Sequence, residues 1–367
     1  MIEDLCGRVD YDETGAGSTV VLVPGSCSTG AVWRPMLAHW QRGFRCVTTS
    51  LLGYGGTAER RTAGDTDISH EAEAVEAVIR RAGCPVHLVG HSFGGLIALV
   101  VALRRRVPLL RLTIAEAPAA EILRPMGEYR HYLAFRNMTD KYYLAYYSGD
   151  TAAIEQMIDF YGGAGTFSAW PQRLRDYAVE TTPVNLLDWA SAYDFELTPA
   201  MLATVRIPAL VLWGEASHPA AKRANELLAQ YMPKASTTEI AGAAHFMIST
   251  HARAVADIIA QHVARAEQNS PAALDKEPDL GDKQPAARCF LRRRSSDSPQ
   301  DRPLNAGATA RPADDGRDQK QHDGDEEDDL GDFDGRTGNA AKSQNAGDQG
   351  DDQEGNDPAQ HDENLRF

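Results

Sequence analysis

A serine flanked by glycines is the residue of this sequence best suited to covalent chemistry. Residues 90–94 read Gly-His-Ser-Phe-Gly; an apolar run at 86–89 precedes them and an apolar helical pattern follows. A sharp strand-to-helix turn would expose the hydroxyl of Ser92 and place it at a helix N-terminus, where unpaired N–H groups favour negative charge. The motif therefore predicts a nucleophilic serine; a Gly-rich helix start without chemistry is the alternative interpretation.

A histidine near the end of the apolar pattern could serve as the base. A serine hydroxyl is a weak nucleophile until a base takes its proton. Of the eleven histidines, His245 lies in a loop of small residues, 242–246, between the last predicted strand and the last predicted helix. A histidine taken at random has a structural role more often than a catalytic one, so its position in the loop carries this prediction.

The elements that must position these residues alternate along the first half of the chain. Short apolar runs bounded by Gly and Pro predict strands, and helical spacing of apolar residues separates them. Continuous apolar strands separated by helices predict an α/β fold with a mostly parallel sheet and helices on both faces. The predicted strands lie at 20–23, 44–49, 86–89, 112–114, 209–213 and 237–240.

In its motifs the chain resembles the α/β-hydrolase fold family, over nearly all of residues 1–266. The resemblance is carried by the 90–94 motif, the strand and turn at 20–33, the Gly-rich loop at 51–55 and the histidine loop. It implies a hydrolase core at 1–118 and 201–266, interrupted by a helical cap insert at 119–200. It also implies a catalytic triad in the chain order Ser, Asp or Glu, His.

The acid of that triad is where the sequence departs from the family. Serine stands at the usual acid position, Ser217, and it cannot carry the charge that stabilises an imidazolium. We interpret Ser217 as a helix N-cap, with Pro219 in the first turn. Some members of the family, including a group of haloalkane dehalogenases, take their acid from the strand end where Glu116 lies here. We therefore expect Glu116 to be the acid, with Glu215 as the alternative acid. The interpretation without a catalytic role is that Glu116 is a solvent-facing residue at a strand end.

The loop after the first apolar strand resembles the family's oxyanion loop, with Pro24 in place of a histidine. The resemblance assigns the oxyanion-binding N–H groups to Ser26 and Phe93. Backbone donors aimed at a forming oxyanion contribute roughly 2.7–4 kcal/mol each, judged from the loss of one donor. We interpret Cys27 as a residue that lines or packs the site. Ser50 stands where an aspartate is common in the family.

The cap region is rich in aromatic residues. Residues 119–200 hold 15 of the 27 aromatic side chains of the chain. An apolar cap over a serine favours a small hydrophobic or aromatic substrate, and packing of the cap on the core is the alternative role for these side chains. The spacing of four tyrosines predicts one broad aromatic stripe on a helix: Tyr142, Tyr143, Tyr146 and Tyr147. The cap region holds four further aromatic residues of note: Trp170, Trp189, Tyr193 and Phe195.

The net charge of −15 over 367 residues is concentrated at the C-terminal end. Residues 267–367 hold 25 acidic and 13 basic side chains and no Val, Ile, Met, Trp or Tyr, which predicts a disordered acidic tail. An acidic chain has no general electrostatic attraction to nucleic acid, so nucleic-acid binding is disfavoured. The longest apolar run is too short to span a membrane. The first residues lack the profile of a signal peptide, and the five cysteines show no CxxC spacing. We therefore expect a cytoplasmic protein without a disulfide framework or a zinc site.

Together these patterns predict a serine hydrolase that cleaves an ester or related carbonyl bond with Ser92, His245 and Glu116. No metal or organic cofactor is implied, and the oligomeric state is not indicated. The same fold also hosts C–C hydrolases, lyases, acyltransferases and cofactor-free oxygenases, and a non-catalytic small-molecule binding protein is a further alternative. Family members that act on epoxides or haloalkanes carry aspartate at the position of Ser92, which disfavours those activities.

Overall fold

The computed structural model describes residues 1–4, 7–40, 43–83 and 85–268. The acidic tail predicted at 267–367 lies outside these residues except for its first two positions. Its disorder therefore stays a prediction.

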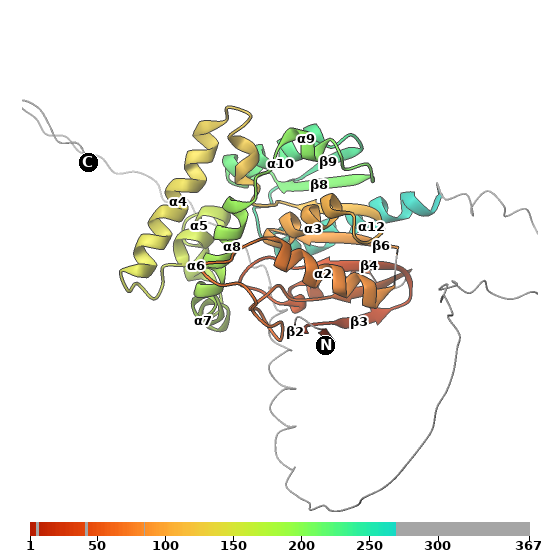
Figure 1. Ribbon diagram of the computed structural model, residues 1–367, viewed down its shortest axis with the longest axis horizontal. Helices are drawn as coiled ribbons and strands as arrows, with labels where there is room; N and C mark the ends of the chain where they lie inside the picture. The colour runs from red at the N-terminus through yellow and green to blue at the C-terminus, as the bar shows by residue number, and fades with distance from the viewer. Residues whose placement is uncertain (5–6, 41–42, 84, 269–367) are drawn as a thin grey trace, which may run out of the picture. The chain divides into compact units, whose positions relative to one another are not determined.

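A seven-stranded, mostly parallel sheet forms the centre of the described chain (Figure 1). The strand order is β3-β5-β4-β6-β7-β8-β9; β3 pairs antiparallel with β5, and all other neighbours pair in parallel. A separate antiparallel pair consists of β1 (Ile2–Asp4) and β2 (Gly7–Val9). The seven strands are β3 (Asp12–Gly15), β4 (Gly17–Val23), β5 (Gly43–Thr48), β6 (Val86–His91), β7 (Leu109–Ala115), β8 (Ala209–Gly214) and β9 (Ala235–Ile240).

Helices cover both faces of this sheet. Successive residues of β4 enter different hydrophobic clusters: Val21 and Val23 pack with α2, α3 and α10, whereas Val20 and Leu22 pack with α1, α11 and α12. This division follows from the pleat, which points neighbouring side chains to opposite faces. The covering helices are α1 (Arg34–Leu37), α2 (Ser69–Ala82), α3 (Phe93–Arg104), α10 (Pro219–Tyr231), α11 (Met247–Thr250) and α12 (Ala252–Gln268), with a 3-10 turn η1 (Gly30–Trp33) before α1.

Between β7 and β8 the chain is helical, and the helices α4 to α8 gather beyond one end of the sheet, on the left in Figure 1. The division into core and cap at 119–200 stays a prediction, and "cap" is used below for these residues. In the described ranges, no helix is both long and apolar enough to cross a bilayer. The helices here are η2 (Ala120–Leu123), α4 (Tyr129–Tyr147), α5 (Glu155–Gly162), α6 (Thr166–Ala169), α7 (Gln172–Glu180), α8 (Thr182–Asp194) and α9 (Pro199–Leu202).

The predicted fold class is confirmed, because the sheet is mostly parallel and helices lie on both of its faces. Each predicted strand falls within one of β4 to β9, allowing one residue at an end. The antiparallel edge strand β3 was not predicted. Its four residues, Asp-Glu-Thr-Gly, are all exposed, so no apolar pattern marks it.

Candidate active site

Ser92 lies in the tight turn between β6 and α3, with a left-handed φ of 52°. Its backbone N–H donates to the carbonyl oxygen of Ala115 on the neighbouring strand, at 2.8 Å. Close packing explains the two glycines of the motif. A Cβ on Gly90 would lie 2.1 Å from the oxygen of Gly94, and one on Gly94 would lie 2.1 Å from the oxygen of Pro24. The strained serine is therefore held by backbone that only glycine can bring so close.

His245 stands between Ser92 and Glu116. Its Nε2 lies 3.0 Å from the Oγ of Ser92, and its Nδ1 lies 2.8 Å from the Oε1 of Glu116. His245 and Glu116 are both buried. The structure thus brings these three residues, far apart in the sequence, into one hydrogen-bonded line. In such a line a base can take the serine proton while a carboxylate orients its ring.

Glu116 follows the end of β7 and has a left-handed φ of 51°, an uncommon conformation for a residue other than glycine. Its Oε2 accepts hydrogen bonds from the hydroxyl of Ser217 at 2.5 Å and from the N–H of Gly214 at 3.2 Å. Burial raises the pKa of the Glu116 carboxyl, but His245, Ser217 and Gly214 outweigh it and hold that pKa below its ordinary value. Glu116 is therefore an ionised acid inside the protein.

The prediction that Ser217 is a helix cap was wrong. Helix α10 begins at Pro219, and the residue that caps it is His218, whose Nδ1 accepts from a backbone N–H of the first turn. Ser217 follows β8, which is the parallel neighbour of β7, so the two strand ends bring Ser217 next to Glu116. An ionised carboxylate is a stronger hydrogen-bond acceptor than a neutral group, so the hydroxyl of Ser217 donates to Glu116 and does not cap the helix.

The loop that carries His245 is held from two sides. Glu215, the alternative acid, is exposed and accepts from the N–H of Gly242 at 2.8 Å, and Glu116 takes the imidazole of His245. His91 lies on the other side, with its Nε2 2.9 Å from the carbonyl oxygen of His245. Burial and the neighbouring His245 lower the pKa of His91 to about 3, so His91 is neutral and donates to that oxygen.

The loop after β4 passes directly beside Ser92. A Cβ on Gly25 would lie 2.8 Å from the Cβ and 3.3 Å from the Oγ of Ser92. Ser26 comes next in this loop, and Phe93 is the first residue of α3. Among the hydrogen bonds of the described residues, none has the backbone N–H of Ser26 or Phe93 as its donor. Both residues line the cavity over Ser92.

This cavity is lined mainly by apolar and aromatic side chains, several of them from the cap. The ring of Tyr161, on α5, stacks on His245 with ring centroids 4.0 Å apart. Trp170 and Trp189 line the cavity, as the aromatic content of the cap suggested. Tyr161 was not predicted as a cavity residue, because its neighbours in the sequence do not distinguish it from the other tyrosines of the cap.

The four tyrosines of α4 do not line the cavity. Tyr142 is fully buried in the core, whereas Tyr147 is 74% exposed. The hydroxyl of Tyr143 donates to the carbonyl oxygen of Leu186 in α8, at 2.6 Å. The alternative interpretation, packing of the cap, therefore describes Tyr142 and Tyr143 correctly. Consecutive positions on a helix are about 100° apart, so the predicted stripe is too broad to face one cavity.

Polar groups also reach the cavity from α8. Asn185 and Asp188 line it, and both are buried. The Oδ1 of Asn185 and the hydroxyl of Tyr161 have no hydrogen-bond partner among the described residues. Burying a polar atom without a hydrogen-bond partner costs about 1–3 kcal/mol of stability. These two atoms therefore favour a ligand that can form hydrogen bonds with them.

Cys27 lines the cavity as well, and it has a left-handed φ of 56°. Burial raises the pKa of its thiol to about 12. Because the thiolate is the nucleophilic form of cysteine, Cys27 is a poor nucleophile at neutral pH. Within residues 1–268 as described, no group of three or more His, Cys, Asp or Glu side chains is arranged to hold a metal ion.

Comparisons with known proteins agree with this architecture. A profile of the alpha/beta hydrolase family matches residues 20–258. Epoxide hydrolase 2 of Caenorhabditis elegans is 24% identical over 261 residues, which cover 65% of this chain and 72% of the relative. The pimeloyl-[acyl-carrier protein] methyl ester esterase of Aliivibrio salmonicida is 38% identical over 110 residues, which cover 29% of this chain and 40% of the relative.

Solved structures of low sequence identity share the fold. An esterase from Exiguobacterium antarcticum superposes with a TM-score of 0.57 at 16% identity, over 72% of this chain and 98% of that one. An enol-lactonase from Burkholderia xenovorans gives a TM-score of 0.55 at 18% identity, over 70% of this chain and 96% of that one. At these identities the likeness concerns the fold alone.

Proposed function

Because this chain belongs to the alpha/beta hydrolase family, we propose that it is a serine hydrolase that cleaves an ester or related carbonyl bond. The observation that carries the proposal is the hydrogen-bonded line from Ser92 through His245 to Glu116. Hydroxyl, imidazole and carboxylate in this order are the groups that acyl transfer requires.

The first half of the proposed reaction acylates the serine. The Nε2 of His245 takes the proton of Ser92 as its Oγ attacks the substrate carbonyl carbon, and Glu116 stabilises the imidazolium that forms. The backbone N–H groups of Ser26 and Phe93 donate to the oxyanion of the tetrahedral intermediate. His245 then gives the proton to the leaving oxygen, and the acyl group stays on Ser92 as an ester.

The second half releases the acyl group. His245, neutral again, takes a proton from water as the water oxygen attacks the acyl carbonyl carbon. Collapse of the second tetrahedral intermediate returns this proton from His245 to the Oγ of Ser92 and frees the carboxylic acid. One water is consumed, and serine and histidine return to their starting states.

The identity of the nucleophile favours carbonyl chemistry over the reaction that the epoxide hydrolase relative is named for. Attack of a serine oxygen on an epoxide or haloalkane carbon would leave an alkyl ether on Ser92. Such an ether has no carbonyl carbon for water to attack, so the serine could not be regenerated. A serine ester, by contrast, is cleaved by the same His245 that formed it.

The cavity supports a small and mostly apolar substrate. Aromatic side chains form much of its wall, which favours apolar groups near the reacting carbonyl. The amide of Asn185 offers a hydrogen bond to a polar group of the substrate, because its Oδ1 has no partner among the described residues. A substrate that makes this bond would be selected over an analogue that lacks the polar group.

The proposal is tested with p-nitrophenyl esters of several chain lengths and a fluorophosphonate probe. The wild type should hydrolyse at least one ester and become labelled at Ser92, whereas Ser92→Ala should do neither. Ser236→Ala, on β9, removes a hydroxyl that donates to the carbonyl oxygen of Ala209 at 3.4 Å, and it should keep full activity. Labelling of Ser92→Ala at the wild-type level would contradict the assignment. Labelling of the wild type without turnover of any ester would favour a binding protein instead.

A further inference from the structure

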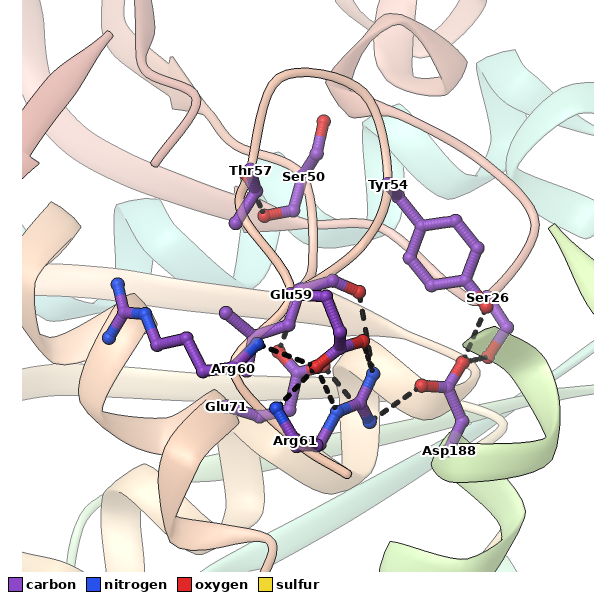
Figure 2. A network of polar contacts seen from close by, with 10 residues as sticks. Ser26, Ser50, Tyr54, Thr57, Glu59, Arg60, Arg61, Glu71 and Asp188 are labelled. Atoms are coloured by element: carbon purple, nitrogen blue, oxygen red, sulfur yellow. Dashed lines mark hydrogen bonds and ion pairs between the residues drawn. The ribbon is translucent and has the colours of Figure 1, made fainter. Parts of the chain in front are cut away.

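Asp188 is a buried acid of helix α8 that the proposed reaction does not use. Its side chain is 2% exposed, and its carboxylate accepts three side-chain hydrogen bonds. The Oδ2 accepts from the hydroxyls of Ser26 at 2.6 Å and Tyr54 at 2.7 Å, and the Oδ1 accepts from the Nη1 of Arg61 at 2.8 Å. Figure 2 shows this carboxylate with the two hydroxyls on one side and the guanidinium on the other. Asp188 thus ties a cap helix to two loops of the core.

Arg61 supplies the positive charge for this network. Its side chain is fully buried and also pairs with Glu59 at 2.8 Å and with Glu71 at 3.3 Å (Figure 2). A buried carboxylate needs such a partner, because desolvation disfavours its charged form. Replacing a buried ion pair by apolar side chains is often neutral or stabilising, so stability alone is a weak explanation for this network. The position in which the network holds the loop around Ser26 offers a better explanation.

The loop that Asp188 holds is the one beside the nucleophile. Ser26 is preceded by Gly25, whose backbone packs against Ser92, and is followed by Cys27 with its left-handed φ of 56°. A non-glycine residue in this conformation costs on the order of 1–3 kcal/mol and persists only where the surroundings determine it. Side-chain contacts hold both chain neighbours of Cys27: the hydroxyl of Ser26 donates to Asp188, and the hydroxyl of Ser28 donates to the carbonyl oxygen of Gly25 at 2.8 Å.

We propose that Asp188 is a positioning residue for the oxyanion hole, which it assembles by holding the side chain of Ser26. The inference rests on the proposed function, which assigns the backbone N–H of Ser26 to the oxyanion. Holding the hydroxyl of Ser26 fixes the direction of that N–H from outside the loop. The oxyanion hole is then complete only while α8 is seated on the core.

The same helix also lines the cavity, through Asn185, Asp188 and Trp189. A substrate in the cavity therefore contacts the helix that sets the position of the oxyanion donor. A second polar link between core and helix lies further along α8, where the hydroxyl of Thr66 donates to Asp194 at 2.6 Å. Neither Thr66 nor Asp194 lines the cavity, so this link offers a matched control for the bond between Ser26 and Asp188.

The test compares Ser26→Ala, Asp188→Asn, their double variant and the control Thr66→Val in steady-state ester hydrolysis. Misplacing a catalytic group by about 1 Å can cost about 100-fold in rate, so we expect kcat to fall about 10- to 100-fold in each of the first two variants. KM should change less than about threefold, because the contact acts on the transition state. The double variant should be no slower than the slower single variant, since both remove one interaction. Thr66→Val should keep the wild-type kcat.

A second readout separates positioning from a general loss of structure. A trifluoromethyl ketone adds to Ser92 and places its oxyanion in the hole, so Ser26→Ala and Asp188→Asn should weaken its binding about as much as they lower kcat/KM. Unchanged kcat and unchanged inhibitor binding in an active, folded Ser26→Ala would overturn the inference and leave the proposed function standing. If the wild type showed no ester hydrolysis, or if its hydrolysis did not depend on Ser92, the proposed function would be overturned, and the inference with it.

Discussion

Two buried acids, one in the core and one in the cap, show how differently this protein uses a carboxylate. Glu116 follows a strand of the core sheet, and Asp188 lies within helix α8. Each accepts three hydrogen bonds from the protein, and each is almost fully enclosed. The number of contacts therefore does not distinguish them.

The partners do distinguish them. Glu116 faces the imidazole of His245, whose charge would change in the proposed proton transfer, together with a hydroxyl and a backbone N–H. Asp188 faces the guanidinium of Arg61, which is always charged. Burial raises the pKa of Asp188 above its ordinary value, and Arg61 only partly opposes this; at Glu116 the pKa lies below its ordinary value. The core acid is thus paired with a mobile charge and the cap acid with a fixed one.

This difference separates two roles. A carboxylate beside a mobile proton can stabilise a charge that exists only during the reaction, as the imidazolium proposed for His245 would require. A carboxylate beside a permanent cation gains nothing during the reaction, but it holds its hydrogen-bond donors in place throughout. We therefore expect Glu116 to act on rate through charge and Asp188 to act on rate through position.

Neutralising the core acid should have the largest effect. Glu116→Gln keeps the shape of the side chain but removes the charge that stabilises the imidazolium, so we expect kcat to fall about 10³- to 10⁴-fold. Steady-state hydrolysis of a p-nitrophenyl ester at neutral pH measures the loss.

The matched control is Glu215→Gln, which removes the exposed acid on the same loop system. It should cost less than about tenfold, because Glu215 bonds a backbone N–H with a side chain open to solvent. A larger loss in Glu215→Gln than in Glu116→Gln would move the triad acid to Glu215. A loss in Asp188→Asn as large as that in Glu116→Gln would remove the distinction between the two acids.

Much of the fold could be predicted from the sequence, because strands buried on both faces are continuous apolar runs. Val20 to Val23 and Ala209 to Trp213 are examples, and both lie within central strands. Ser92 and His245 could be singled out for a similar reason, because glycine and alanine around them mark places where backbone must pass closely. The edge strand β3 lacks any such signal, since its side chains are exposed.

The contacts between distant loops could not be predicted. Ser217 contacts Glu116 across 101 residues of sequence, and Asp188 contacts Ser26 across 162. Polar residues of this kind follow no periodicity, so the sequence does not show which carboxylate a hydroxyl will meet. The local pattern favoured a helix cap at Ser217, because serine is common at the N-cap and proline is common in the first turn that follows. Tertiary packing overrode that preference.

The Asp188 network should respond to pH in the opposite sense to Glu116. Burial raises the pKa of Glu71 from 4.5 to about 7, with Arg61 opposing and Asp188 assisting the shift. As pH rises from about 4.5 to 7, the unfolded chain releases this proton before the folded one, so wild-type stability falls over that window. Glu71→Gln should remove this decline. From pH 5 to pH 8 the variant should lose on the order of 1–3 kcal/mol less unfolding free energy than the wild type.

Urea unfolding at the two pH values measures this difference, and titration of the histidines cancels between variant and wild type. Glu180→Gln, which removes an exposed acid of the cap, serves as the control variant. Glu116 should show the reverse sign, because its pKa is lowered in the folded protein. The ionised carboxylate stabilises the fold at pH values above the ordinary pKa of glutamate, and this stabilisation is lost as the pH falls. Equal slopes in wild type and Glu71→Gln would show that Glu71 is ionised within the fold at pH 5.

Removing one donor from the core acid should have the smallest effect. Ser217→Ala deletes the hydroxyl that lies 2.5 Å from Glu116 and leaves His245 and Gly214 bonded to the carboxylate. A hydrogen bond to a charged group contributes about 1.5–3 kcal/mol to stability, and only part of this concerns the transition state, so we expect kcat/KM to fall about tenfold. The pKa of Glu116 should rise, and activity should therefore be lost at higher pH on the acid side of the profile. The control Ser236→Ala should match the wild type at every pH. If Ser217→Ala matched it too, the charge of Glu116 would be maintained by His245 and Gly214 alone, and Ser217 would be a structural residue.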